Sequence, residues 1–387
     1  MKDNELKVTA NLFSRIDTKA LKGIAIILML FHHLVGFPDR WPLEFTGFKT
    51  LWPGFINGGY LHDIALNAKL CVPIFFFLGG YGLYKRWING KFRVSSTIMN
   101  LYKEYWKVFI IFIPIAFIFF NKNTSSINIL CTKYNIISIK DFITTIIANF
   151  IGYSSSLNGE WWFFGSYVCV IPLGYLFCKF NKNKNDFWHE FIIVLAIDIL
   201  IRNIFPNISE FEPFSSLKYN IYYNNLLTNS PFSSTFFAGI VFAKYNTIIT
   251  LKKTLKSITF YPILALGIII IIYWSRMYII GNNLDIIYTS LLIPTISILL
   301  DWLKPLKKIF VFLGKHSTNM WLIHSFYCYY FYEFTKIIYS TQNVWINLII
   351  LLIISLATSV LLELLYAILM NLSKKVKYIL PNKKNIE

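Results

Sequence analysis

Charged residues are scarce in this sequence. Only 14% of its 387 residues are Asp, Glu, Lys or Arg and 56% are hydrophobic, whereas soluble domains average about 25% charged residues. This composition argues against a water-soluble enzyme and indicates a chain that folds in a lipid bilayer. Cysteine is scarce too, and the five cysteines form no CxxC pair. We therefore expect neither a disulfide framework nor a metal site.

Long apolar runs stand where the charges are missing. A transmembrane helix needs about 20 predominantly apolar residues, and ten runs approach that length. They are residues 21–37, 64–84, 106–120, 161–177, 187–205, 232–243, 258–274, 284–300, 320–334 and 344–370. The sequence thus predicts an all-α, polytopic membrane bundle of about ten transmembrane helices. A further apolar stretch, "DFITTIIANFIG", is too short to cross and is typical of an interfacial or re-entrant helix.

The basic residues predict how these helices are oriented. Lys and Arg accumulate in cytoplasmic loops, and with the N-terminus inside, 27 of the 37 fall in cytoplasmic segments. We therefore expect both termini in the cytoplasm. Residues 1–19 form the N-terminal segment, 20–370 a single membrane domain and 371–387 a basic tail. The first nineteen residues lack a signal-peptide pattern, which predicts a multi-pass protein of the plasma membrane.

The net charge of +18 is spread over every predicted cytoplasmic loop. It forms no single basic face with interleaved aromatic residues, so a nucleic-acid partner is not expected. The expected partner is the lipid bilayer, whose anionic headgroups attract such loops. No pattern in the sequence names a protein partner.

Two adjacent histidines lie in the first predicted helix, in "KGIAIILMLFHH" from Lys22 to His33. A helix rises 1.5 Å per residue, which places His33 about 16 Å from Lys22 along the axis and near mid-membrane. Ionisable residues at such depth are functional candidates, and imidazole suits general-base catalysis near neutral pH. Hydrogen bonding to a neighbouring helix or a water pocket would also explain them. Because adjacent helix positions point about 100° apart, His32 and His33 cannot serve one site equally.

A third histidine lies late in the chain, in "LGKHSTNMWLIHSF". Ser317 can cap the helix, and His324 then lies about 10 Å beyond it. Since this span rises from the same predicted face as Lys22, His324 reaches a depth comparable to that of His33. Two imidazoles at similar depth are a stronger indication of a site than either one alone.

Each of two further motifs can be interpreted in two ways. In "GEWWFF", Glu160 beside Trp161 and Trp162 can orient a polar substrate, although two tryptophans at an interface are also typical of an aromatic belt. In "VPIFFFLGGYGL", Gly79 and Gly80 thin a helix where something approaches closely, and that can simply be another helix.

Few other charges fall within the predicted spans. Asp198 and Arg202 are spaced i,i+4, which predicts that they neutralise each other. Lys69 and Asp285 lie near span ends, where their side chains can reach the membrane surface.

Together the four motifs resemble the acyltransferase-3 family of integral membrane O-acyltransferases, which modify extracytoplasmic glycans. "KGIAIILMLFHH" has the family's spacing of ten residues between a basic residue and histidine, with lysine in place of the usual arginine. "VPIFFFLGGYGL" is similar to its Phe-Phe-rich stretch, with Gly79 where serine is common. "EWWFF" and "LGKHSTNMWLIHSF" resemble its Trp-Phe-Leu and late histidine motifs, and all four occur in family order.

The resemblance implies ten helices and a mechanism. Cytoplasmic acyl-CoA, most often acetyl-CoA, would donate an acyl group that ends on a hydroxyl of a cell-surface glycan. His33 would be the catalytic histidine, as general base or transient acyl carrier, and Lys22 would contact the donor. Lysine lacks arginine's bidentate fork for phosphate. Arg93 and Lys103, in the basic second cytoplasmic loop, are further candidate contacts for CoA phosphates.

Two other functions fit ten spans. A transporter or polysaccharide-export component would use His33 and His324 as a proton relay, but the paired broken helices of many transporters are missing. A glycan polymerase or ligase would instead use the long outer loops. We expect an acyltransferase.

Overall fold

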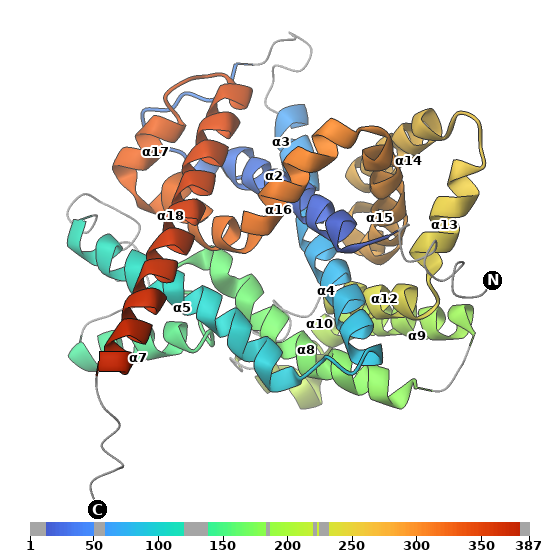
Figure 1. Ribbon diagram of the computed structural model, residues 1–387, viewed down its shortest axis with the longest axis horizontal. Coiled ribbons are helices and arrows are strands. Elements are labelled where there is room, and N and C mark those ends of the chain that lie inside the picture. The colour runs from blue at the N-terminus through green and yellow to red at the C-terminus, as the bar shows by residue number, and fades with distance from the viewer. Residues whose placement is uncertain are drawn as a thin grey trace, which may run out of the picture.

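The computed structural model describes residues 13–49, 59–119, 138–182, 186–219, 223 and 232–379. Most of these residues are helical, and none of them forms a strand, as expected for an all-α protein. The helices are α2 (Arg15–Val35), α3 (Gly59–Asn67), α4 (Cys71–Ile88), α5 (Val94–Phe119), α7 (Ile139–Phe150), α8 (Trp162–Phe180), α9 (Phe187–Ile199), α10 (Phe205–Ile208), α12 (Ser233–Lys244), α13 (Thr247–Lys256), α14 (Tyr261–Ser275), α15 (Asp285–Trp302), α16 (Lys304–Ser325), α17 (Tyr332–Ile338) and α18 (Val344–Ile379) (Figure 1). Cys131, residues 1–12 and residues 380–387 lie outside the described part of the chain.

Seven helical stretches of the described residues are long and apolar enough to cross a membrane. They are Arg15–Val35, Tyr60–Ile88, Gly159–Phe180, Phe187–Ile208, Tyr261–Tyr278, Asp285–Trp302 and Val344–Leu372. Each coincides with one of the ten predicted spans. The other three predicted spans are helical as well but differ in form. α5 carries Lys103, Glu104 and Lys107, α12 is only 12 residues long, and residues 320–334 are divided between α16, a π-helical turn and α17. The count of ten stays a prediction.

Helix α2 is longer at its N-terminal end than its apolar run. Ser14 caps the helix by accepting a hydrogen bond from a backbone N–H, and Asp17 completes a capping box. Lys22 consequently lies two turns inside the helix, and His33 lies in its last turn. The depth near mid-membrane that we expect for His33 stays a prediction.

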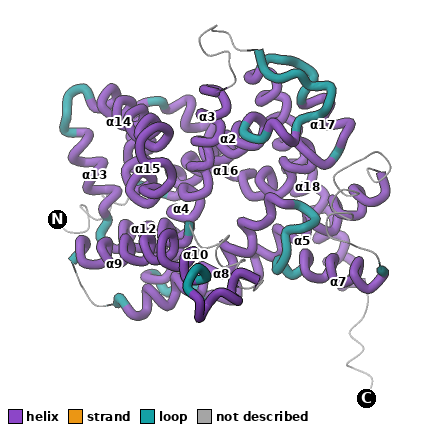
Figure 2. Tube along the Cα trace, turned by 180° about the vertical axis from the view of Figure 1, so that it is seen from behind, coloured by secondary structure: helices purple, strands orange, loops and turns teal. Residues whose placement is uncertain are grey.

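Glycine brings two pairs of helices into close contact. A Cβ atom on Gly314 of α16 would lie 1.8 Å from the carbonyl oxygen of Lys19 in α2, and one on Gly23 would lie 2.0 Å from that of Phe310. α4 and α12 meet in the same way, through Gly80 and Gly239. Such small-residue contacts are a common means of association between membrane helices. Helix packing therefore explains Gly80, and the central position of α2, α16 and α4 is visible from both sides (Figures 1 and 2).

Buried ion pairs neutralise most of the deep charges. Arg202 Nε lies 2.9 Å from Asp198 Oδ1, as the i,i+4 spacing predicts. Arg276 Nε lies 2.6 Å from Asp285 Oδ1, and Asp285 is fully buried. The expectation that Asp285 reaches the membrane surface is thus wrong, because its partner approaches it inside the bundle. Breaking a buried pair by removing one partner costs about 3–5 kcal/mol, so the Arg276–Asp285 pair constrains how the turn after α14 packs against α15.

The segment "DFITTIIANFIG" forms α7, as predicted, beginning at a Ser138 capping box. The helix ends against α5, where the Tyr105 hydroxyl donates to the Asn149 carbonyl and the Trp106 indole N–H donates to that of Phe150.

Candidate active site

His33 lies beside a buried carboxylate at the C-terminal end of α2. Its Nε2 is 3.3 Å from Glu160 Oε2, and the other oxygen of Glu160 is 2.8 Å from Nη1 of Arg40. The carboxylate therefore bridges an imidazole and a guanidinium. The side chains of His33 and Glu160 are only 10% and 8% exposed, whereas that of Arg40 is 40% exposed. Burial opposes the charge of Arg40, but the Glu160 carboxylate outweighs it and raises the pKa of the guanidinium.

A polar clamp holds Glu160 in place. Glu160 lies in the short 3₁₀ turn η4 (Gly159–Trp161), whose first amide groups are held by hydrogen bonds from two directions. Asn158 Oδ1 accepts from the Glu160 N–H, and the Gly159 N–H donates to the Tyr330 hydroxyl over 3.0 Å. Asn158 is itself fully buried and exchanges hydrogen bonds with the Ser325 hydroxyl. The motif "GEWW" is thereby fixed to the end of α16.

The end of α16 also carries the third histidine. The ring of His324 lies 4.8 Å from that of His33, between centroids. The expectation that Ser317 caps this helix is wrong, because α16 begins at Lys304 and Ser317 lies inside it. His324 is fully buried, and its Nδ1 donates to the Trp321 carbonyl over 2.7 Å. A neutral His324 then has a lone pair on Nε2, an atom that is buried with no hydrogen-bond partner among the described residues. An unsatisfied acceptor beside His33 can receive a hydrogen bond from a substrate or a water molecule.

The two adjacent histidines have different neighbours. His32 Nδ1 donates to the Ala65 carbonyl over 2.8 Å and so fixes α2 to α3. The ring of His33 packs against Phe37 and lies near Tyr329, whose hydroxyl donates to the His33 carbonyl. Only His33 contacts Glu160, which agrees with the different directions of adjacent positions on one helix.

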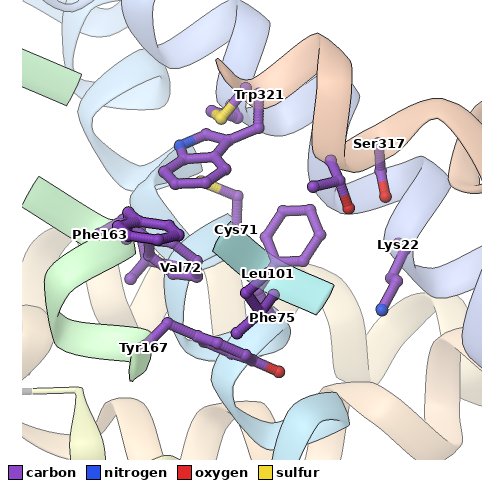
Figure 3. A pocket seen from close by; sticks show the side chains of 12 residues that line it. Lys22, Cys71, Val72, Phe75, Leu101, Phe163, Tyr167, Ser317 and Trp321 are labelled. Atoms are coloured by element: carbon purple, nitrogen blue, oxygen red, sulfur yellow. The ribbon is translucent and has the colours of Figure 1, made fainter. Parts of the chain in front are cut away.

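Two cavities lie side by side along α2 inside the bundle. The His33 cavity, of about 290 Å³, is lined by His32, His33, Arg40, Lys69, Glu160, Trp162 and Phe232, among others. The Lys22 cavity, of about 100 Å³, is lined by Lys22, Ser317 and several aromatic residues. Both include Met29, Cys71, Val72, Phe163 and Trp321, so they are adjacent. Figure 3 shows Trp321, Phe163 and Tyr167 around one part of the Lys22 cavity, with Lys22 and Ser317 across from them.

A third cavity lies at the opposite end of α2 and is basic. Its lining includes Arg15, Lys85, Arg86 and Lys253 and, among the residues that the structure describes, no carboxylate. Thr18 lines this basic cavity and Lys22 lines the next one, a single turn further along α2. On α4 the order is reversed, with Phe75 in the Lys22 cavity and Arg86 in the basic cavity. The three cavities therefore follow one another along the antiparallel helices α2 and α4.

The comparisons with known proteins agree with this arrangement. A family model described as an acyltransferase domain matches residues 15–364, nearly the whole chain. The chain belongs to the acyltransferase-3 family. Neither the search of curated proteins nor that of solved structures gave a match. With seven membrane-spanning candidates, this family member is a multi-pass membrane acyltransferase rather than a transporter.

The predicted site residues of this acyltransferase fall into two groups. His33, His32, Glu160 and Trp162 line the His33 cavity, His324 touches His33, and Lys22 and Ser317 line the next cavity. Trp161 lines neither, because its ring packs against Tyr105 and its N–H donates to the Leu322 carbonyl. Arg93 and Lys103 are exposed and line none of these three cavities.

Arg40, Asn158 and Tyr329 were not predicted as site residues. Arg40 and Tyr329 lie in "FPDRW" and "FYCYY", which have no distinguishing spacing, and each reaches the site from a distant part of the chain. Asn158 directly precedes "GEWW" in the sequence. This position next to the motif was the one sequence feature that could have identified Asn158 as a site residue. No group of three or more His, Cys, Asp or Glu side chains within the described ranges could hold a metal ion.

Proposed function

We propose that this acyltransferase moves an acetyl group from cytoplasmic acetyl-CoA to a hydroxyl of an extracytoplasmic glycan at the plasma membrane, with His33 as the catalytic base. One observation carries the proposal. His33 and the Glu160–Arg40 pair line one cavity, with the His324 ring 4.8 Å from that of His33, and this cavity adjoins the Lys22 cavity, beyond which a basic cavity lies at the other end of α2.

The reaction needs a base for the acceptor hydroxyl. His33 takes the hydroxyl proton while the oxygen attacks the thioester carbonyl, and the collapsing intermediate expels CoA thiolate, which receives the proton from the imidazolium. A buried imidazolium is costly without a counter-ion. Glu160 provides that negative charge 3.3 Å from Nε2, and the Arg40 guanidinium contacts its other oxygen. Glu160 is therefore a positioning residue that acts through His33, comparable to the acid of a catalytic triad.

The donor is proposed to enter from the Arg15 end of α2. The CoA phosphates carry several negative charges, and Arg15, Lys85, Arg86 and Lys253 offer a cavity of matching sign. From there the thioester arm reaches the Lys22 cavity, whose aromatic lining suits an uncharged chain. With the N-terminus in the cytoplasm, this end faces the donor and Arg40 faces the acceptor.

The test uses purified protein in proteoliposomes, radiolabelled acetyl-CoA and a panel of oligosaccharide acceptors. We expect acceptor-dependent CoA release and labelled glycan. Absence of both with every acceptor tried would contradict the proposal.

The same preparation distinguishes a base from an acyl carrier. When labelled acetyl-CoA is supplied without acceptor, a base leaves the protein unlabelled. Label retained on His33 after denaturation, located by peptide mass spectrometry, would instead make His33 the transient carrier.

A further inference from the structure

Lys69 is the cation of the His33 cavity that has no carboxylate partner. It lies in the 3₁₀ turn η3 (Ala68–Leu70) between α3 and α4, and its side chain lines the cavity beside His33 and Glu160. Within the described residues its Nζ forms no ion pair, and its one close contact of note is the Phe232 ring, 5.6 Å away. The expectation that Lys69 merely extends to the membrane surface therefore does not describe its position.

Several other deep cations of the chain are neutralised, although Lys22, which lines the next cavity, has no ion pair among the described residues either. Arg202 pairs with Asp198, Arg276 with Asp285 and Lys244 with Glu190. Lys252 and Lys307 both pair with Asp301. Lys69 differs from these, and an unpaired ionisable group inside a membrane protein is by default a candidate ligand contact.

No carboxylate elsewhere in the cavity can neutralise Lys69. Glu160 is the only acidic residue that lines this cavity, and its two oxygens face His33 and Arg40. The segments outside the described residues offer none nearby in sequence either, since residues 50–58, 120–137, 183–185 and 220–231 contain no Asp or Glu. If the histidines are neutral, the cavity lining carries two positive charges, on Arg40 and Lys69, and one negative charge, on Glu160. The lining therefore has a net charge of +1.

A second cation, which is paired with Asp198, also lies near Phe232. The Arg202 guanidinium carbon lies 5.8 Å from the Phe232 ring centroid, on which Lys69 also packs. Although Arg202 Nε pairs with Asp198, its Nη2 is buried without a hydrogen-bond partner among the described residues. Two hydrogen-bond donors thus lie near the Phe232 ring. They are the Lys69 ammonium, which has no carboxylate partner, and Arg202 Nη2.

We propose that Lys69 binds an anionic group, a carboxylate or phosphate, carried by the substrate whose acyl transfer His33 catalyses. The proposal rests on the proposed function for the identity of that substrate. The acceptor is the favoured source of the anion, for example a uronic acid or a glycan phosphate next to the acylated hydroxyl. The same chemistry can come from the donor if the transferred group is a dicarboxylic acyl such as succinyl.

Binding is tested first, without any reaction. The melting temperature of the detergent-purified protein is measured with glucuronate, inorganic phosphate or glucose, each at the same ionic strength set with sodium chloride. We expect glucuronate or phosphate to stabilise the wild type and glucose to have no effect. Lys69→Met is expected to abolish the shift, Lys69→Arg to retain it, and Lys49→Met, at an exposed lysine, to leave it unchanged. Equal shifts in Lys69→Met and wild type would overturn the proposal even if acyl transfer is active.

Turnover then identifies the source of the anion. A uronic-acid oligosaccharide is compared with its carboxyl-reduced form, and acetyl-CoA is compared with succinyl-CoA. Lys69→Met is expected to lower kcat/KM about 10- to 100-fold for the combinations that carry the anion and to leave the neutral combination unchanged. Loss confined to the uronic-acid acceptor assigns the anion to the acceptor, and loss confined to succinyl-CoA assigns it to the donor. An equal loss for all combinations, or none, contradicts the site.

Discussion

At the scale of single residues, the site depends on how one carboxylate is shared. Glu160 contacts His33 with one oxygen and Arg40 with the other, and its backbone N–H donates to Asn158 Oδ1. A group held in this way has little freedom to move during a reaction, which favours a role in fixed charge stabilisation. Three predictions follow from single side chains.

His33→Ala should reduce acyl transfer by about 100-fold or more, because general-base catalysis contributes about 10²- to 10⁴-fold. His32→Ala should retain most of the activity, since His32 donates to the Ala65 carbonyl and does not contact Glu160. Both rates are measured in proteoliposomes at matched protein content. If His32→Ala is inactive and His33→Ala is active, the assignment of His33 as the catalytic histidine is wrong.

Glu160→Gln should lower kcat by about two orders of magnitude with a smaller change in KM, because the amide cannot balance a protonated His33. The comparison variant is Glu44→Gln, at an exposed carboxylate that accepts a hydrogen bond from Tyr332. Partial recovery in Glu160→Asp is also expected. A change in KM alone would assign Glu160 to substrate binding.

His324→Phe should lower the rate about 10-fold or more while the protein still inserts and elutes as a single species, because it removes the free Nε2 acceptor next to His33. A rate equal to that of the wild type would reduce His324 to a packing residue.

At the scale of helices, glycine determines how closely α2 and α16 approach each other. The positions of His33 on α2 and His324 on α16 depend on this distance. A side chain on Gly314 would collide with the backbone of α2, and this contact cannot relax through a flexible side chain. The polar clamp at Asn158 and the bond between His32 and Ala65 join α8 and α3 to the same two helices.

Gly314→Leu should destabilise the protein by about 1–3 kcal/mol, the usual cost of overpacking, and should lower activity by moving His324 away from His33. Heat-induced loss of the monodisperse peak in size-exclusion chromatography measures the first effect. Gly267→Leu is the control, because a Cβ atom there meets nothing within 4 Å. Similar stability of the two variants would show that the contact is not tight.

At the scale of the whole molecule, the cavities follow α2 from a basic end to the Arg40 end. Such an order suits a protein that receives its two substrates from opposite sides of a membrane. Under the proposed function, the donor phosphates bind in the basic cavity and not at the exposed Arg93 or Lys103.

Arg86→Gln should raise the KM for acetyl-CoA about 10-fold with little change in kcat, because it removes a charged contact in the basic cavity. Lys308→Gln, at an exposed lysine that lines none of the three cavities, should behave as the wild type. If Arg93→Gln raises this KM and Arg86→Gln does not, the donor binds outside the basic cavity.

The parts of this architecture that sequence could predict are those with local patterns. Apolar runs identified seven spans, and the i,i+4 spacing identified the Asp198–Arg202 pair. The assignment of His33 from its interval to Lys22 stays a prediction. Arg40 could not be found this way, since it meets Glu160 across 120 positions of sequence and its own segment has no periodicity. Nor could Asp285 be placed, because the buried charge is satisfied by Arg276 on a neighbouring helix.

The π-helical turn η9 (Phe326–Tyr330), which follows His324, has a consequence for the length of this segment. A π-turn inserts one extra residue into an α-helical path, and each residue rotates a helix by about 100°. Tyr329 reaches His33, and Tyr330 reaches Gly159, only with this extra residue present. A one-residue deletion here would turn both hydroxyls away from the site while leaving composition and hydropathy almost unchanged. The geometry therefore predicts that the length of this short segment matters to the site, as the identity of its two tyrosines does.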